Sequence, residues 1–203
     1  GSLPRVHHPG NLAAEWKRVI IRLPFRDHRA APSRRSMQPD QSDSPRTSVL
    51  FVCLGNICRS PLAEGIFQHL VDEAGLSDRF QIDSAGTGAW HVGERPDARA
   101  SMVATQHGVE LLSRARQITE DDLKTYHHVV VMDLENLRNV QRMADALGDE
   151  ATAEIHLLRA FDPEGGDGDE VPDPYYGGAS GFENVYQMVH RSCRTLLDRL
   201  RTV

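Results

Sequence analysis

One eight-residue stretch organises this chain: Cys53-Leu54-Gly55-Asn56-Ile57-Cys58-Arg59-Ser60. It follows the apolar run 48–52 and precedes Pro61 and a pattern of helical spacing. This order predicts a strand that leads to the cysteine, a short loop, and a helix that begins just after the arginine. Backbone N–H groups converge in such a loop, and the helix N-terminus adds partial positive charge. The stretch therefore predicts a binding site for a phosphate dianion.

The side chains of the loop have chemistry that suits a phosphoryl group. Arg59 can hold two phosphate oxygens in a planar fork, which a lysine cannot do. The same positive field favours Cys53 as a thiolate, and a thiolate beneath a bound phosphoryl group is placed for in-line attack. Ser60 can donate a hydrogen bond to the Cys53 sulfur. Asn56 suits a left-handed backbone position, and its amide can brace the loop.

The stretch resembles the signature CLGNICRS of the low-molecular-weight protein tyrosine phosphatases, and the resemblance covers about residues 47–201. A cysteine and an arginine at this spacing are a weak signal alone, and a buried structural cysteine with a surface arginine is the alternative. Here Gly55, Asn56 and the Ser60-Pro61 helix start accompany the preceding strand. The resemblance implies an enzyme that hydrolyses phosphotyrosine through a cysteinyl-phosphate. It also implies phosphotyrosine-containing proteins as substrates, phosphate or other oxyanions as inhibitors bound in the loop, and no cofactor.

The proton donor for the leaving oxygen is expected in the segment 171–176, Val-Pro-Asp-Pro-Tyr-Tyr. The family carries its general acid in a DPYY motif near the C-terminus, so the resemblance implies that Asp173 is the acid and then the base. The flanking prolines restrict the backbone and point the carboxyl group. Without the resemblance, one more acid in the acidic loop 162–180 would be the simpler interpretation.

The resemblance also implies which residues surround the substrate. An aromatic slot of this kind suits phosphotyrosine and leaves the shorter phosphoserine out of reach of the thiolate. A branch of the family that removes phosphate from arginine carries Thr in place of Ile57, so Ile57 favours tyrosine. Ordinary core or rim aromatic residues are the alternative for this set. The expected slot residues are Leu54, Ile57, Trp90, Tyr175 and Tyr176; Gly55, Asn56, Cys58 and Ser60 are expected with them at the phosphate.

Two further residues have roles that the resemblance implies. Cys58 matches the second thiol with which the family traps the oxidised nucleophile as a reversible disulfide, and a small apolar residue inside the loop is the alternative. Ser84 matches part of a network that braces Asn56. Several family members carry His where this chain has Ser113. We therefore expect this brace to be altered and not lost.

Strand and helix patterns alternate along the chain, which predicts an α/β fold: a single domain with a small parallel β-sheet and helices on both faces. The resemblance makes this fold flavodoxin-like, of the phosphotyrosine protein phosphatase I type. The site should lie at the carboxyl ends of the strands, where the strand order reverses. The expected strands are 48–52, 79–83, 128–132 and 154–158, and the expected helices are 60–74, 96–107, one that starts after Thr119, one capped by Asp133 that runs to 147, and 181–201.

The chain is expected to divide into a flexible basic leader at 1–46 and a phosphatase domain at 47–203. Gly1-Ser2 resembles a cloning scar. Residues 1–46 carry nine Lys/Arg and four Asp/Glu, whereas residues 47–203 carry 14 and 25, for a net charge of −11. The leader fits a targeting peptide, a docking segment, or sequence translated upstream of a start at Met37. An acidic domain is a poor nucleic-acid binder.

The overall composition, with 39% hydrophobic and 26% charged residues, is typical of a globular protein without a membrane span. Three cysteines favour a reducing, cytoplasmic setting. We expect a monomer, with weak self-association left open. The ten histidines show no metal-ligand spacing, so no metal site is predicted.

An arsenate reductase would need two more cysteines after the loop, and Cys193 is the only one there. A phosphotyrosine-binding module without activity would lack Cys53, Arg59 or Asp173.

Overall fold

The structure is a computed structural model that describes residues 46–166, 169–175 and 179–202. The predicted leader, apart from Arg46, and Tyr176 lie outside the described residues.

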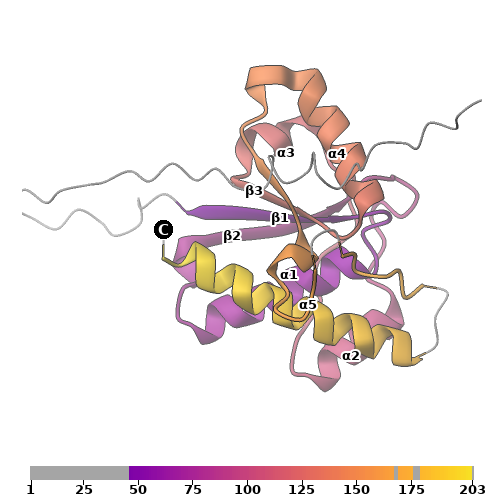
Figure 1. The fold of residues 1–203 in the computed structure, drawn as a ribbon. Helices are drawn as coiled ribbons and strands as arrows, with labels where there is room; N and C mark the ends of the chain where they lie inside the picture. The colour runs from indigo at the N-terminus through magenta and orange to yellow at the C-terminus, as the bar shows by residue number, and fades with distance from the viewer. Residues whose placement is uncertain (1–45, 167–168, 176–178, 203) are drawn as a thin grey trace, which may run out of the picture. The chain divides into compact units, whose positions relative to one another are not determined.

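A four-stranded parallel sheet forms the centre of the domain (Figure 1). Its strands are β1 (Thr47–Cys53), β2 (Phe80–Gly86), β3 (His128–Val131) and β4 (Glu154–Leu157). They lie in the order β2-β1-β3-β4. The chain passes from β1 to β2 on one side and returns to β3 on the other, so the strand order reverses at β1. The predicted α/β fold is confirmed. The residue Cys53, at the end of β1, lies at the carboxyl edge of the sheet where this reversal occurs.

In the described part of the chain, α-helices α1 to α5 cover the two faces of the sheet (Figure 1). Helices α1 (Arg59–Glu73) and α5 (Ala179–Leu200) pack against one face, with α2 (Ala98–Gln106) beside them. Helices α3 (Glu120–Thr125) and α4 (Leu134–Leu147) cover the other face. The expected helices at 60–74, 96–107, 119 onward, 134–147 and 181–201 are confirmed in type and order.

The apolar run of β1 explains why both faces are covered. Val49 and Phe51 belong to the core beneath α1 and α5, whereas Leu50 and Val52 belong to the core beneath α3 and α4. All four side chains are fully buried. Because successive side chains of a strand point to opposite faces, an uninterrupted apolar run is what a doubly covered strand requires. Burial of each such side chain stabilises the fold by about 1.5–3 kcal/mol.

The ends of several elements differ from the predicted ranges. Strand β2 runs to Gly86, three residues beyond the predicted end, because Ser84, Ala85 and Gly86 pair with the last residues of β1. Helix α2 begins at Ala98 because the side chain of Asp97 accepts a hydrogen bond from the Arg99 N–H and caps the helix. A capping box at Thr119 starts α3, and Asp133 caps α4, both as predicted.

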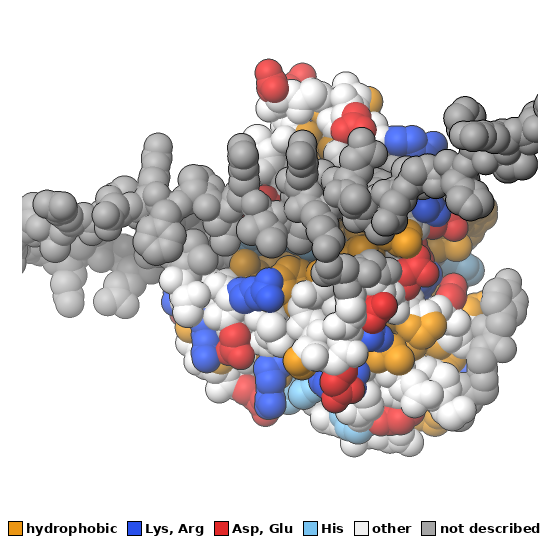
Figure 2. All heavy atoms as spheres, viewed as in Figure 1, with side chains coloured by type: hydrophobic (Ala, Val, Ile, Leu, Met, Phe, Trp, Pro, Cys, Tyr) orange, Lys and Arg blue, Asp and Glu red, His pale blue; other side chains and the backbone are white. Residues whose placement is uncertain are grey.

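In the described part of the chain, none of the helices combines the length and apolarity that a membrane crossing requires. Acidic and basic side chains are interspersed over the visible described part of the face that carries α5 (Figure 2).

Candidate active site

The stretch 53–60 forms a tight loop between β1 and α1. Asn56 has a φ of 55°, and among the described residues other than glycine it alone has a positive φ, as its left-handed preference predicts. This turn directs the Asn56 N–H to the Cys53 Sγ at 3.2 Å, and Ser60 Oγ donates to the same sulfur at 3.0 Å. Cys53 is 2% exposed. Two donors therefore converge on a buried sulfur, an arrangement that stabilises a thiolate.

The N-terminus of α1 faces the same space. Cys58 is its N-cap residue and makes no side-chain capping hydrogen bond. The first N–H groups of any α-helix lack partners within the helix, so those of α1 remain available to an anion.

Arg59 extends from this helix start into the site and is 4% exposed. Its Nη1 donates to Asp133 Oδ2 at 2.6 Å and to the Val171 carbonyl at 3.2 Å, and its Nη2 lies 3.4 Å from Asp173 Oδ2. Burial alone would lower the pKa of Arg59, but the acidic groups nearby, Cys53 first and then Asp133, raise it above its ordinary value. The guanidinium is therefore charged and fixed. Asp133 was predicted only as a helix cap; its position after β3, at the same sheet edge as Cys53, was the available signal.

Asn56 lies at the centre of the brace beneath the loop. Its Nδ2 donates to Ser60 Oγ at 2.9 Å and to Ser84 Oγ at 2.8 Å, and its Oδ1 accepts from the Arg116 N–H at 2.9 Å. Ser84 Oγ donates to Glu64 Oε2 at 2.6 Å. The predicted brace through Ser84 is present. It continues to Glu64, a residue that the sequence analysis did not assign.

Glu64 also explains how the chain accommodates Ser113. Burial raises the pKa of Glu64, while hydrogen bonds from Ser84 and Ser113 lower it in part. Ser113 therefore joins the brace through this carboxyl group. The expectation that the brace is altered and not lost agrees with these contacts.

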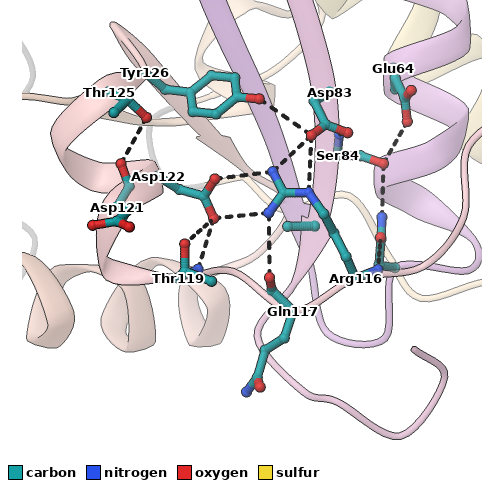
Figure 3. Close-up of polar contacts among 12 residues, drawn as sticks. Glu64, Asp83, Ser84, Arg116, Gln117, Thr119, Asp121, Asp122, Thr125 and Tyr126 are labelled. Atoms are coloured by element: carbon teal, nitrogen blue, oxygen red, sulfur yellow. Dashed lines mark hydrogen bonds and ion pairs between the residues drawn. The ribbon is translucent and has the colours of Figure 1, made fainter. Parts of the chain in front are cut away.

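Arg116 connects the brace to two further elements (Figure 3). Its guanidinium lies between Asp83 of β2 and Asp122 of α3, with Nη2 2.8 Å from Asp83 Oδ2 and Nη1 2.9 Å from Asp122 Oδ2. Tyr126 Oη donates to Asp83 at 3.3 Å. The backbone N–H of Arg116 thus binds the Asn56 side chain. The ion pairs of the Arg116 guanidinium fix the position of that backbone N–H. Arg116 was not predicted from the sequence, because Asn56 and Asp83 are 60 and 33 positions away from it.

The loop forms the floor of a pocket of about 280 Å³. Asn56, Ser60 and Ser84 were also predicted for the site, and they lie in the brace under the loop and not at the pocket surface. His91 lines the pocket without having been predicted. The walls are open to solvent, with Trp90 72% and Tyr175 41% exposed. The lining residues are Cys53, Leu54, Gly55, Ile57, Cys58, Arg59, Trp90, His91, Asp173 and Tyr175.

Asp173 reaches the pocket from the segment 169–175. Its side chain is 42% exposed, and its Oδ1 accepts from the Tyr175 N–H at 3.0 Å. Val171 N–H donates to the Met132 carbonyl at 2.8 Å, which anchors the segment to the end of β3. Arg99 Nη1 donates to the Tyr175 carbonyl at 3.0 Å, and its guanidinium lies over the Tyr175 ring at 5.3 Å. Arg99 was not predicted from the sequence, and it holds the wall that carries Asp173.

The other two cysteines have distinct surroundings. Cys58 lines the pocket, where burial, with a smaller contribution from the negative charge of Asp97 and Cys53, raises its pKa to about 12. It is therefore a neutral thiol at pH 7. Cys193 is fully buried on α5, where its pKa is raised by burial. All three cysteines are free.

Comparison with known proteins gives a consistent result. The model of the family described as low molecular weight phosphotyrosine protein phosphatase matches residues 48–203. A low molecular weight phosphotyrosine protein phosphatase from Sus scrofa is 44% identical over 154 residues, which are 76% of this chain and 96% of that protein. A solved protein tyrosine phosphatase from Entamoeba histolytica is 32% identical with a TM-score of 0.72, over 77% of this chain and 97% of that one. A solved drosophila arginine phosphatase is 36% identical with a TM-score of 0.69, over 75% and 96%.

Proposed function

Because the chain belongs to the low molecular weight phosphotyrosine protein phosphatase family, we propose that its protein-tyrosine phosphatase activity proceeds through a cysteinyl-phosphate on Cys53. Arg59 clamps the phosphate, and Asp173 is the general acid and then the general base. The observation that carries this proposal is the meeting of these three side chains in one pocket. Two hydrogen bonds reach the Cys53 sulfur, and Arg59 Nη2 lies 3.4 Å from Asp173.

In the first step the Cys53 thiolate attacks phosphorus, and the bond between phosphorus and the tyrosine oxygen breaks. Asp173 gives its proton to that oxygen, so the tyrosine leaves as a neutral phenol. Arg59 and the N–H groups of the loop hold the three equatorial oxygens of the transferring group. These donors are fixed before the reaction, so their orientation costs nothing when charge develops.

In the second step water attacks phosphorus and the Asp173 carboxylate takes its proton. The bond between sulfur and phosphorus breaks, and the electron pair returns to Cys53 as inorganic phosphate leaves. The hydrogen bond from Ser60 Oγ stabilises the thiolate as it departs. No step of this mechanism requires a cofactor.

We propose phosphotyrosine as the substrate group because of the pocket walls. Leu54, Ile57, Trp90 and Tyr175 surround the thiolate with apolar and aromatic surface, which fits a phenyl ring. The structural similarity to an arginine phosphatase makes phosphoarginine the competitor. The side chain of Ile57 in the pocket wall is apolar and has no hydroxyl group with which to bind a guanidinium.

Steady-state hydrolysis of phosphotyrosine, phosphoserine and phosphoarginine peptides tests this proposal, with reductant and chelator present. We expect turnover of the phosphotyrosine peptide and its loss in Cys53→Ser, and Cys193→Ser is the control for removal of a thiol. Phosphotyrosine binding without turnover by intact protein would contradict the mechanism. Faster turnover of phosphoarginine than of phosphotyrosine would contradict the substrate.

We propose further that Cys58 protects the nucleophile in a reducing, cytoplasmic setting. Peroxide converts the Cys53 thiolate to a sulfenic acid, and the Cys58 sulfur then displaces water to form a disulfide. The support for this proposal is that both cysteines line one pocket and that Cys58 is protonated, which leaves Cys53 as the first thiol to react.

This proposal predicts that a thiol reductant restores activity after peroxide treatment in the wild type but not in Cys58→Ser. Residual activity after treatment and dialysis is the measurement, with Cys193→Ser as the control variant. Full recovery in Cys58→Ser would contradict a protective disulfide.

A further inference from the structure

A second cluster of chemically active side chains lies away from the pocket, on strands β3 and β4. His128 is the first residue of β3, and Glu154 and His156 belong to β4. His128 pairs with Glu154, and Val130 pairs with His156. Because side chains alternate along a strand, the three residues lie on the same face of the sheet. The cluster begins at the amino end of β3, whereas Cys53 lies at the carboxyl end of β1.

The three side chains direct one ligand atom each to a common point. His128 Nδ1 and His156 Nε2 are 3.5 Å apart, and Glu154 Oε2 lies 3.6 Å from the first nitrogen and 3.4 Å from the second. The atoms form a nearly equilateral triangle. A tetrahedral zinc site with bonds of about 2.1 Å has edges of about 3.4 Å between ligand atoms. The triangle therefore has the size of one face of such a tetrahedron.

The surroundings fix the ligands and leave one side open. The side chains of His128 and His156 are 15% and 16% exposed, while that of Glu154 is 44% exposed. The His156 ring packs edge-on against Phe161 at 5.6 Å, which restrains its orientation.

Direct contacts among the three side chains explain the geometry of the cluster less well than a bound ion does. At 3.5 Å the contact between the two imidazoles is longer than an ordinary hydrogen bond. Arg199, whose charge acts on His156, opposes a cation nearby, but its guanidinium stacks on the Phe161 ring at 5.1 Å. The Glu154 carboxylate offsets this charge.

We propose that His128, Glu154 and His156 bind one divalent zinc ion, with its fourth position open to water beside Glu154. Two imidazoles and a carboxylate are a ligand set that zinc accepts, and the absence of a thiolate disfavours softer ions. The ion would join edge strand β4 to β3 and so stabilise the folded state in proportion to its occupancy. The sequence analysis predicted no metal site because only Glu154 and His156 are close in sequence.

Calorimetric titration of the full chain with zinc chloride tests this proposal. Every protein carries Cys53→Ser so that the pocket thiolate does not compete for the ion. We expect His156→Gln and Glu154→Gln each to weaken the association at this site more than about tenfold. The paired change His7→Gln/His8→Gln removes leader histidines and is the matched control, for which we expect this association to be unchanged.

Two further measurements keep the result interpretable. Visible absorption of bound cobalt reports the coordination geometry of the site, and we expect it in the Cys53→Ser protein and its loss when Glu154→Gln is added. Zinc should raise the melting temperature of Cys53→Ser and leave that of Cys53→Ser/Glu154→Gln unchanged. Because Gln has the shape of Glu and residue 154 is exposed, this variant keeps the fold. Equal zinc affinity in Glu154→Gln and its parent, or loss of binding only in the leader variant, would overturn the proposal.

Discussion

The two halves of the pocket are built in different ways. The loop 53–60 is continuous in sequence, and Cys53, Asn56, Arg59 and Ser60 are each at most 4% exposed. Asp173 comes 114 positions after Arg59, from an acidic segment, and its side chain is 42% exposed. The loop is held by the sheet and the first turn of α1. The acid is held by a few contacts from Arg59, Arg99 and Met132. The proposed oxyanion binding therefore depends on a buried loop, and the proposed proton transfer depends on how a partly exposed surface segment is positioned.

The largest expected effect comes from Arg59→Lys, which leaves a charge in the loop and removes the fork. We expect kcat/KM for an aryl phosphate to fall about 10³-fold, because an ammonium cannot hold two oxygens together with Asp133. Steady-state kinetics measure this, with the exposed Arg79→Lys as control. A loss of kcat/KM below about tenfold would show that a positive charge at residue 59 is sufficient and that the planar fork is not required.

Asp173→Asn tests the acid half of the pocket, because its effect should depend on the pKa of the leaving group. We expect phenyl phosphate, whose phenol has a pKa of about 10, to slow about 10²-fold, and an activated aryl phosphate to slow less than about tenfold. An activated phenol leaves without a proton, so only the first substrate needs the acid. Glu164→Gln, in the same acidic loop, is the control and should slow neither. Equal slowing of both substrates by Asp173→Asn would remove Asp173 from the acid role.

Arg99→Ala tests whether the acid segment needs support from α2. We expect about a tenfold loss with phenyl phosphate, because Arg99 binds the Tyr175 carbonyl and stacks on its ring. In the Asp173→Asn background the same change should have little further effect. Arg194→Ala, on the exposed side of α5, is the matched control. Independent, additive losses would contradict a positioning role for Arg99.

The smallest expected effect concerns the brace under the loop and is a pH dependence of the free energy of unfolding. Burial raises the folded-state pKa of Glu64 above its ordinary 4.5. The stability that neutral Glu64 contributes is therefore complete below the unfolded pKa and is lost as the pH rises through the folded pKa. Glu64→Gln keeps a neutral partner for Ser84 and should remove this loss. Urea unfolding between pH 4 and 7.5 measures it, with the exposed Glu110→Gln as control. If the free energy of unfolding of Glu64→Gln depended on pH as it does in the wild type, this would contradict a buried carboxylate whose charge destabilises the fold.

The sequence predicted the loop half more completely than the acid half, for a physical reason. The order of strand, nucleophile, left-handed Asn56 and helix start is local, so one continuous stretch of sequence predicts the geometry of the loop. No periodicity marks the contacts of Asp133 with Arg59, of Arg99 with Tyr175 or of Arg116 with Asn56, because these partners are far apart in sequence. His91 enters the pocket because it lies over Gly55, with 3.1 Å between its ring and the place of a Cβ on that residue. The three ligands on β3 and β4 meet only through strand register, which the sequence does not specify.

The position of β1 between β2 and β3 has a further consequence. Its residues 49–52 are fully buried in two separate cores, so the strand opens only when the whole domain unfolds. The nucleophile loop continues from this strand and shares its protection against amide hydrogen exchange. We expect the acid segment, where the Asp173 side chain is 42% exposed, to exchange its amide hydrogens faster than β1. Mild warming should then weaken the proposed proton transfer before phosphate binding is lost.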